Sequence, residues 1–136
     1  MQWLPRGAGF DLTYSRAMAQ LATHSPVFGE RMKAWGEAKE AGIRATSNAE
    51  DRQNAWYSLA TLYAAENDPG GVERCLRTAI ACAPNWFKPP WTLANLLEMT
   101  GRHGEAMTEA GVAVERDAGR DPEVLATWTA VSSKSR

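Results

Sequence analysis

Hydrophobic residues recur every three or four positions along most of the chain, which is the spacing of one face of an α-helix. The clearest stripe consists of Trp56, Leu59, Ala60 and Tyr63, and its i, i+3, i+4, i+7 spacing places the four side chains on one face. A second stripe of the same kind lies in 72–79. The pattern therefore predicts an all-α protein built from short amphipathic helices.

Polar caps, prolines and glycines separate the apolar stripes and predict where helices begin and end. We expect helices at about 12–23, 26–45, 50–65, 69–83, 88–100, 103–117 and 122–132. The start signals are Ser25-Pro26, the capping-box pattern Ser47-Asn48-Ala49-Glu50, Asp68-Pro69, Asn85 and Asp121-Pro122. The expected core-facing stripes of the first and last helices are Tyr14, Ala17, Met18 and Leu21, and Val124, Leu125, Trp128 and Val131.

The segment 54–117 matches itself at an offset of 34 residues. Leu59-Ala60 falls on Leu93-Ala94, and Ala79 falls on Ala113. A period of 34 is that of the tetratricopeptide repeat (TPR), and the first copy resembles the family in its Trp56, Leu59, Ala60, Tyr63, Ala79 and Pro84. The second copy departs from the family at Pro90, Ala110 and Ala118, where the pattern has Trp, an aromatic residue and Pro.

The resemblance implies a right-handed α-solenoid of about three helical hairpins with a C-terminal capping helix, in a single domain of 1–136. Its expected parts are an irregular segment 1–10, a divergent TPR-like hairpin 11–46, repeats 53–86 and 87–120, a capping helix 121–132 and a polar tail 133–136. Trp56 lies 42 positions after Tyr14, so the first hairpin is expected to be longer than a standard repeat.

The composition is that of an ordinary globular chain, with 136 residues, 44% hydrophobic content and a formal net charge of −1. Charges of both signs are interspersed, which argues against a nucleic-acid partner or an anionic membrane surface. No apolar run reaches the length of a membrane helix, and the first ten residues lack the apolar core of a signal peptide. A soluble, cytoplasmic protein is favoured, with tethering to the inner membrane as the alternative if the chain belongs to a longer protein.

The sequence contains no nucleophile elbow, phosphate loop or Cys/His pair at metal-ligand spacing, so we expect neither catalysis nor a cofactor or metal. Cys75 and Cys82 are seven residues apart on one helix, about 10 Å along its axis, which is too far for a disulfide. Both are expected to be small packing residues. His24 and His103 are expected to be solvated turn residues.

TPR arrays resemble one another in using the first helix of each pair to line a concave groove. Helical geometry places that face beside the core stripe, offset by one residue in the sequence. The predicted partner-binding groove is formed by Asn54, Tyr57, Thr61, Lys88, Trp91, Asn95 and Glu98. From the first helix the groove would take Ser15, Ala19 and Arg16. Asn95 would bond the backbone of an extended peptide and Trp91 would cover an apolar side chain. The alternative is that Trp91 and Tyr57 only pack, and Lys88 alone does not make the family's carboxylate clamp.

A second resemblance is narrower. The runs 11–19 and 51–97 are similar to the C-terminal TPR region of bacterial O-antigen-ligase-like membrane proteins. That resemblance implies a soluble accessory domain of a glycan polymerase, with the transfer chemistry elsewhere. The main hypothesis is a non-catalytic scaffold that binds a peptide or partner protein. A third reading is a self-associating module, a homodimer through the first or seventh helix.

Overall fold

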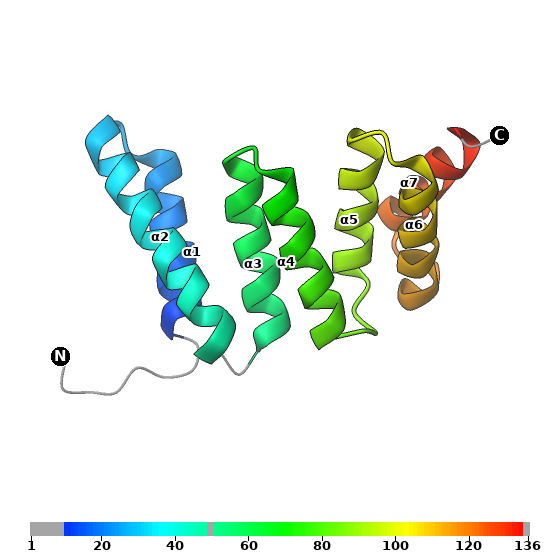
Figure 1. Ribbon diagram of the computed structural model, residues 1–136, viewed down its shortest axis with the longest axis horizontal. Coiled ribbons are helices and arrows are strands. Elements are labelled where there is room, and N and C mark those ends of the chain that lie inside the picture. The colour runs from blue at the N-terminus through cyan, green and yellow to red at the C-terminus, as the bar shows by residue number, and fades with distance from the viewer. Residues whose placement is uncertain (1–9, 49–50, 135–136) are drawn as a thin grey trace. The chain divides into compact units, whose positions relative to one another are not determined.

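The computed structural model describes residues 10–48 and 51–134, and these residues form seven α-helices and no strand (Figure 1). The helices are α1 (Phe10–His24), α2 (Phe28–Asn48), α3 (Arg52–Ala65), α4 (Pro69–Cys82), α5 (Lys88–Met99), α6 (His103–Asp117) and α7 (Pro122–Lys134). The all-α prediction is confirmed. Residues 1–9 of the expected irregular segment 1–10 lie outside the described residues, as do the last two residues, whereas residue 10 is the first of α1 and not irregular.

The predicted capping box at the α2–α3 junction is wrong. Ser47 belongs to α2, where its hydroxyl donates to the Arg44 carbonyl at 3.3 Å. The N-cap of α3 is Asp51, and its side chain makes no capping hydrogen bond. Ala49 and Glu50, the second half of the predicted box, lie outside the described residues.

Two other start signals are displaced. Pro26 precedes α2 instead of sitting in its first turn, and the Ser25 hydroxyl donates to Glu30 Oε2 at 2.9 Å. The N-cap of α5 is Phe87 and not Asn85. The Asp121 signal is confirmed, because Asp121 Oδ1 accepts the backbone N–H of Glu123 at 2.9 Å at the start of α7.

The chain divides into two compact units between Asp68 and Pro69. In the first unit α1 packs along α2, and α2 packs on α3. The buried face of α2 carries small residues, which let the helices approach closely: Ala34, Ala38, Ala41 and Ala45. Gly42 lies where α1, α2 and α3 meet, and a Cβ there would be 3.1 Å from Ser15 Oγ and 3.2 Å from Leu62 Cδ1.

The extra length of the first hairpin lies in α2, which has 21 residues against 14 in α3. Trp35 and Lys39 both reach Glu66, the residue that caps the C-terminal end of α3. The turns of α2 before Trp35 therefore project about 10 Å past the end of α3. The expectation of a longer first hairpin is confirmed.

In the second unit α4 packs on α5, α5 on α6 and α6 on α7, and α5 also touches α7. The fully buried residues include Leu76, Leu93, Ala94, Leu97, Ala106, Ala110 and Ala113. Val124 and Val131 of α7 are buried as predicted, and the Trp128 ring lies against Gly111 of α6. Leu125 was predicted to share this face and is 45% exposed, so that assignment is wrong.

None of the helices that the structure describes combines the length and the apolar composition needed to cross a lipid bilayer. The assignment of 1–136 to a single domain with repeats at 53–86 and 87–120 stays a prediction.

Candidate partner-binding surfaces

Three of the seven predicted groove residues lie in the first unit, on α3. Asn54, Tyr57 and Thr61 follow i, i+3, i+7, so they share a face of the helix. Thr61 is exposed, whereas Asn54 and Tyr57 are half-buried. The Asn54 amide donates to Asp51 Oδ2, and the Thr61 hydroxyl donates to the Ser58 carbonyl at 2.6 Å. The first of these bonds holds the amide against the start of the helix.

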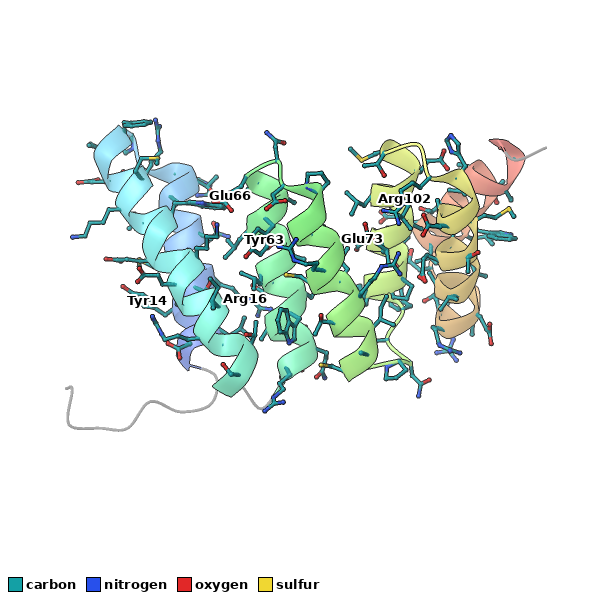
Figure 2. The ribbon with its side chains drawn as sticks, viewed as in Figure 1. Tyr14, Arg16, Tyr63, Glu66, Glu73 and Arg102 are labelled. Atoms are coloured by element: carbon teal, nitrogen blue, oxygen red, sulfur yellow. The ribbon has the colours of Figure 1, made fainter. Side chains whose placement is uncertain are left out.

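The contribution expected from α1 is partly wrong. Ser15 is 1% exposed, and its hydroxyl donates to the Ala38 carbonyl of α2 at 2.6 Å. It is therefore a core residue that ties two helices together and not a groove residue. Ala19 is half-buried and Arg16 is exposed; Arg16 is labelled in Figure 2.

The other four predicted residues lie in the second unit, on α5. Lys88 and Asn95 are exposed, and Trp91 is half-buried. The Trp91 indole N–H donates to Thr127 Oγ1 of α7 at 2.8 Å, and the Phe87 ring lies 6.4 Å from the Trp91 ring, centroid to centroid. These two contacts fix the indole in one orientation while leaving part of it in solvent.

Asn95 lies one turn beyond Trp91, and its amide donates to the Trp91 carbonyl at 3.1 Å. A primary amide carries two donor hydrogens and an acceptor oxygen. Because Asn95 is exposed, it keeps the capacity to bond a ligand that lies along α5.

Glu98, the last predicted residue of the set, is largely buried, with 14% of its side chain exposed. Its Oε1 atom contacts Nδ1 of His103, the first residue of α6. His103 is solvated as predicted, with 53% of its side chain exposed, but it is the first residue of α6 and also contacts the end of α5. Glu98 is less accessible than Lys88 and Asn95, which are both exposed.

Two charged clusters were not predicted from the sequence. In the second unit, Arg102 Nη1 lies 2.6 Å from Glu73 Oε1 and Arg102 Nε lies 2.5 Å from Glu105 Oε2 (Figure 2). Arg77 also bridges to Glu73 at 2.9 Å. The Arg102 guanidinium lowers the pKa of both glutamates, and they raise the pKa of Arg102.

The other cluster ties α2 to the end of α3 in the first unit. Lys39 Nζ lies 2.9 Å from Glu66 Oε1, and the Trp35 indole donates to Glu66 Oε2 at 3.1 Å. The Lys39 ammonium also lies 5.0 Å from the centre of the Tyr63 ring, in cation–π geometry. Figure 2 shows Tyr63 and Glu66 on the α2 side of α3. Hydrogen bonds from Lys39 and Trp35 lower the pKa of Glu66.

Within the described residues, no three His, Cys, Asp or Glu side chains come together as metal ligands could. Cys75 and Cys82 do not form a disulfide with each other. Cys75 is buried, whereas Cys82 is exposed, so the assignment of Cys82 as a packing residue is wrong.

No family model matches the chain, and no curated protein matches it. Solved structures do. TTC0263, a TPR protein of Thermus thermophilus, is 20% identical over 93% of this chain and 64% of its own, with a TM-score of 0.75. The Sgt2 TPR domain of Aspergillus fumigatus is 13% identical over 96% of this chain and 84% of its own, with a TM-score of 0.72. The Yersinia enterocolitica type III secretion chaperone SycD, in complex with a peptide of the translocator YopD, is 15% identical over 89% of this chain and 94% of its own. Its TM-score is 0.67.

The chain has the tetratricopeptide-repeat fold. This chain spans 64% of the length of TTC0263. The TPR fold confirms the expectation of stacked helical hairpins that the 34-residue period raised. None of the comparisons bears on the resemblance to O-antigen-ligase-like proteins, which stays a prediction.

Proposed function

We propose that this TPR chain is a non-catalytic interaction module that binds an extended peptide of a partner protein. The observation that carries the proposal is that the Trp91 side chain is held in one orientation and is still partly exposed. Its indole is held by Thr127 and Phe87 and is still partly exposed, directly beside the exposed amide of Asn95. An aromatic side chain that is already fixed loses little conformational entropy when a ligand packs on it.

The chemistry of this surface suits a peptide backbone better than a small molecule. An extended peptide presents unpaired N–H and C=O groups, which an amide such as Asn95 can satisfy, while Trp91 offers an apolar surface to a side chain. Lys88 adds one positive charge at the start of the same helix. We therefore expect a ligand with an apolar residue and an acidic residue nearby.

Asn54, Tyr57 and Thr61 of α3 lie in the first unit, and we propose them as a separate strip of contact residues. The SycD structure supports the class of function, because that chaperone has a similar fold and is in complex with a peptide of the translocator YopD.

The test is a quantitative pull-down with three forms of the protein: wild type, Asn95→Ala and Thr129→Ala. Thr129 is the matched control because it is exposed and its hydroxyl also bonds only to the carbonyl four residues earlier on its own helix. We expect Asn95→Ala to recover at least about tenfold less of each specific partner than wild type, because one or two hydrogen bonds to a peptide backbone are removed. Thr129→Ala should recover as much as wild type. Equal recovery by Asn95→Ala and wild type would contradict the proposed site.

A further inference from the structure

Met99, the last residue of α5, is the most exposed of the large hydrophobic residues that the structure describes. Its surface is 84% exposed, against 67% for Phe28 and 56% for Met32. A single exposed apolar residue is common on a protein surface and needs no explanation. The residues beside Met99 on the same helix therefore decide whether it belongs to a binding surface.

Met99 lies in line with the two residues that carry the proposed function. Trp91, Asn95 and Met99 follow one another at intervals of four residues, so they form one inclined row on the surface of α5. Along this row a half-buried aromatic ring is followed by an exposed amide and then by an exposed thioether. The α5 row therefore presents two apolar groups with a hydrogen-bonding group between them.

The spacing of the two apolar groups matches that of side chains in an extended peptide. Met99 follows Trp91 by eight residues, which is about 12 Å along the helix axis. An extended chain advances about 3.3 Å per residue, and its alternate side chains point to the same side. Two side chains four residues apart therefore project from one face about 13 Å apart, and the residue midway between them faces Asn95.

The two ends of the α5 row differ in charge. Lys88 is exposed and precedes Trp91 by about 4.5 Å along the axis, a distance that one or two residues of an extended peptide span. At the other end, the Glu98 carboxylate directly precedes Met99 and contacts Nδ1 of His103. An acidic residue of a ligand is therefore favoured at the Trp91 end and disfavoured at the Met99 end.

We propose that Met99 is the second apolar contact of the peptide site, and that the ligand is an extended segment with apolar residues at positions i and i+4. An acidic residue lies within two positions of the first apolar residue, on the side away from the second. This inference rests on the proposed function and adds the spacing and the charge of the ligand. Trp91 is fixed and selects the first apolar residue by shape, whereas the flexible thioether of Met99 accepts side chains of different shapes.

The first test selects binders from random peptides of about 12 residues displayed on phage, a length that exceeds the span of the α5 row. The full chain is the bait. We expect the enriched peptides to share two apolar residues four positions apart, with Asp or Glu beside the first. Another spacing, or none, overturns the inference. A selection that enriches no peptide contradicts the proposed function itself, and the inference with it.

The second test measures the affinity of an enriched peptide for variants of the protein by titration calorimetry, after circular dichroism has shown that all of them fold alike. Met99→Ala is expected to weaken binding about tenfold, because it removes most of the apolar surface that the peptide covers at this position. Met99→Leu keeps that surface and should stay within about threefold of wild type. The control is Met32→Ala, at an exposed methionine of α2, which should bind within about twofold of wild type.

A double-mutant cycle identifies the ligand residue that Met99 contacts. Replacing the second apolar residue of the peptide by alanine should weaken binding to wild type about tenfold, and binding to Met99→Ala less than about twofold, because that contact is already absent. Replacing the first apolar residue should weaken binding to both forms equally. Losses that add at both peptide positions overturn the inference. Binding that depends on Asn95 and not on Met99 also overturns it, and that result leaves the proposed function standing.

Discussion

Ala118 ends α6 in a left-handed backbone conformation, with φ of 60°, and Gly119 follows it with φ of 68°. A non-glycine residue in this region costs about 1–2 kcal/mol. The TPR pattern has Pro at this position, yet the proline ring fixes φ near −65°. The departure of the second repeat from the family pattern is therefore required by the way α6 ends.

Ala118→Gly is expected to raise the free energy of unfolding by about 0.5–1 kcal/mol, because glycine adopts the left-handed conformation without strain. Ala118→Pro should lower it by about 3 kcal/mol or more, since the Ala118 N–H also bonds to the Glu115 carbonyl at 3.2 Å. Urea titrations measure both changes. The control is Ala130→Gly, at an exposed position inside α7, which should destabilise by about 1 kcal/mol. A neutral proline variant would contradict the left-handed cap.

Ala94 of α5 has no exposed surface, and a larger side chain there has no space to enter. Ala94→Leu is expected to overpack the second unit and to lower the free energy of unfolding by about 1–3 kcal/mol. Denaturant melts give the value. Ala81→Leu, the same change at an exposed position of α4, should stay within about 0.5 kcal/mol of wild type.

At the scale of the element, the α2–α3 contact is held by a charge that can be titrated. The folded-state pKa of Glu66 lies below its ordinary value of 4.5, because Lys39 and Trp35 donate hydrogen bonds to the carboxylate. The contribution to stability is therefore fully present above the unfolded-state pKa, and it is lost as the pH falls through the folded-state pKa. Since the pair is about one-third exposed, we expect about 0.5 kcal/mol.

Glu66→Gln should therefore destabilise the protein by this amount at pH 7 and by less at pH 3, because the wild-type carboxylate loses its charge as the pH falls through its folded-state pKa. Urea midpoints of the two proteins at both pH values check the difference. Glu40→Gln, at an exposed glutamate of α2, is the control and should show no such pH-dependent gap. A gap that is equal at pH 3 and pH 7 would mean that the carboxylate charge is not what joins the helices.

Helix positions were predictable where the start and stop signals are local. The bounds of α6 match the prediction of 103–117, and Asp68-Pro69 and Asp121-Pro122 do start α4 and α7. The α2–α3 junction was misplaced because a capping box is a pattern of only four residues, and it satisfies only two backbone N–H groups. Packing decides otherwise, since Ala45 near the end of α2 is fully buried.

The candidate site was predictable as a set of helix faces and not as a set of contacts. Ser15 was assigned to the groove because spacing alone cannot fix the rotation of α1, which the hydrogen bond to Ala38 determines. The Arg102–Glu73 pair joins residues 29 positions apart, and no local pattern signals such a contact. The fixed orientation of Trp91 likewise depends on Thr127, 36 residues later.

At the scale of the whole molecule, the boundaries of the predicted sequence repeats differ from the boundary between the two compact units. The boundary between the units falls between Asp68 and Pro69, inside the predicted repeat 53–86. α3 packs on α2 in the first unit, and α4 packs on α5 in the second. The predicted 34-residue repeat therefore does not coincide with either compact unit.

The overhang of α2 beyond α3 has a consequence for the exchange of amide hydrogens with solvent. Phe28 and Met32 in the first turns are 67% and 56% exposed, whereas Ala41 and Ala45 have no exposed surface. Local opening of the first turns breaks few contacts, so it needs less free energy than opening of the enclosed part. In deuterated buffer, the amides of 32–34 should therefore lose their protons at least about tenfold faster than those of 41–45, although both segments belong to one continuous helix.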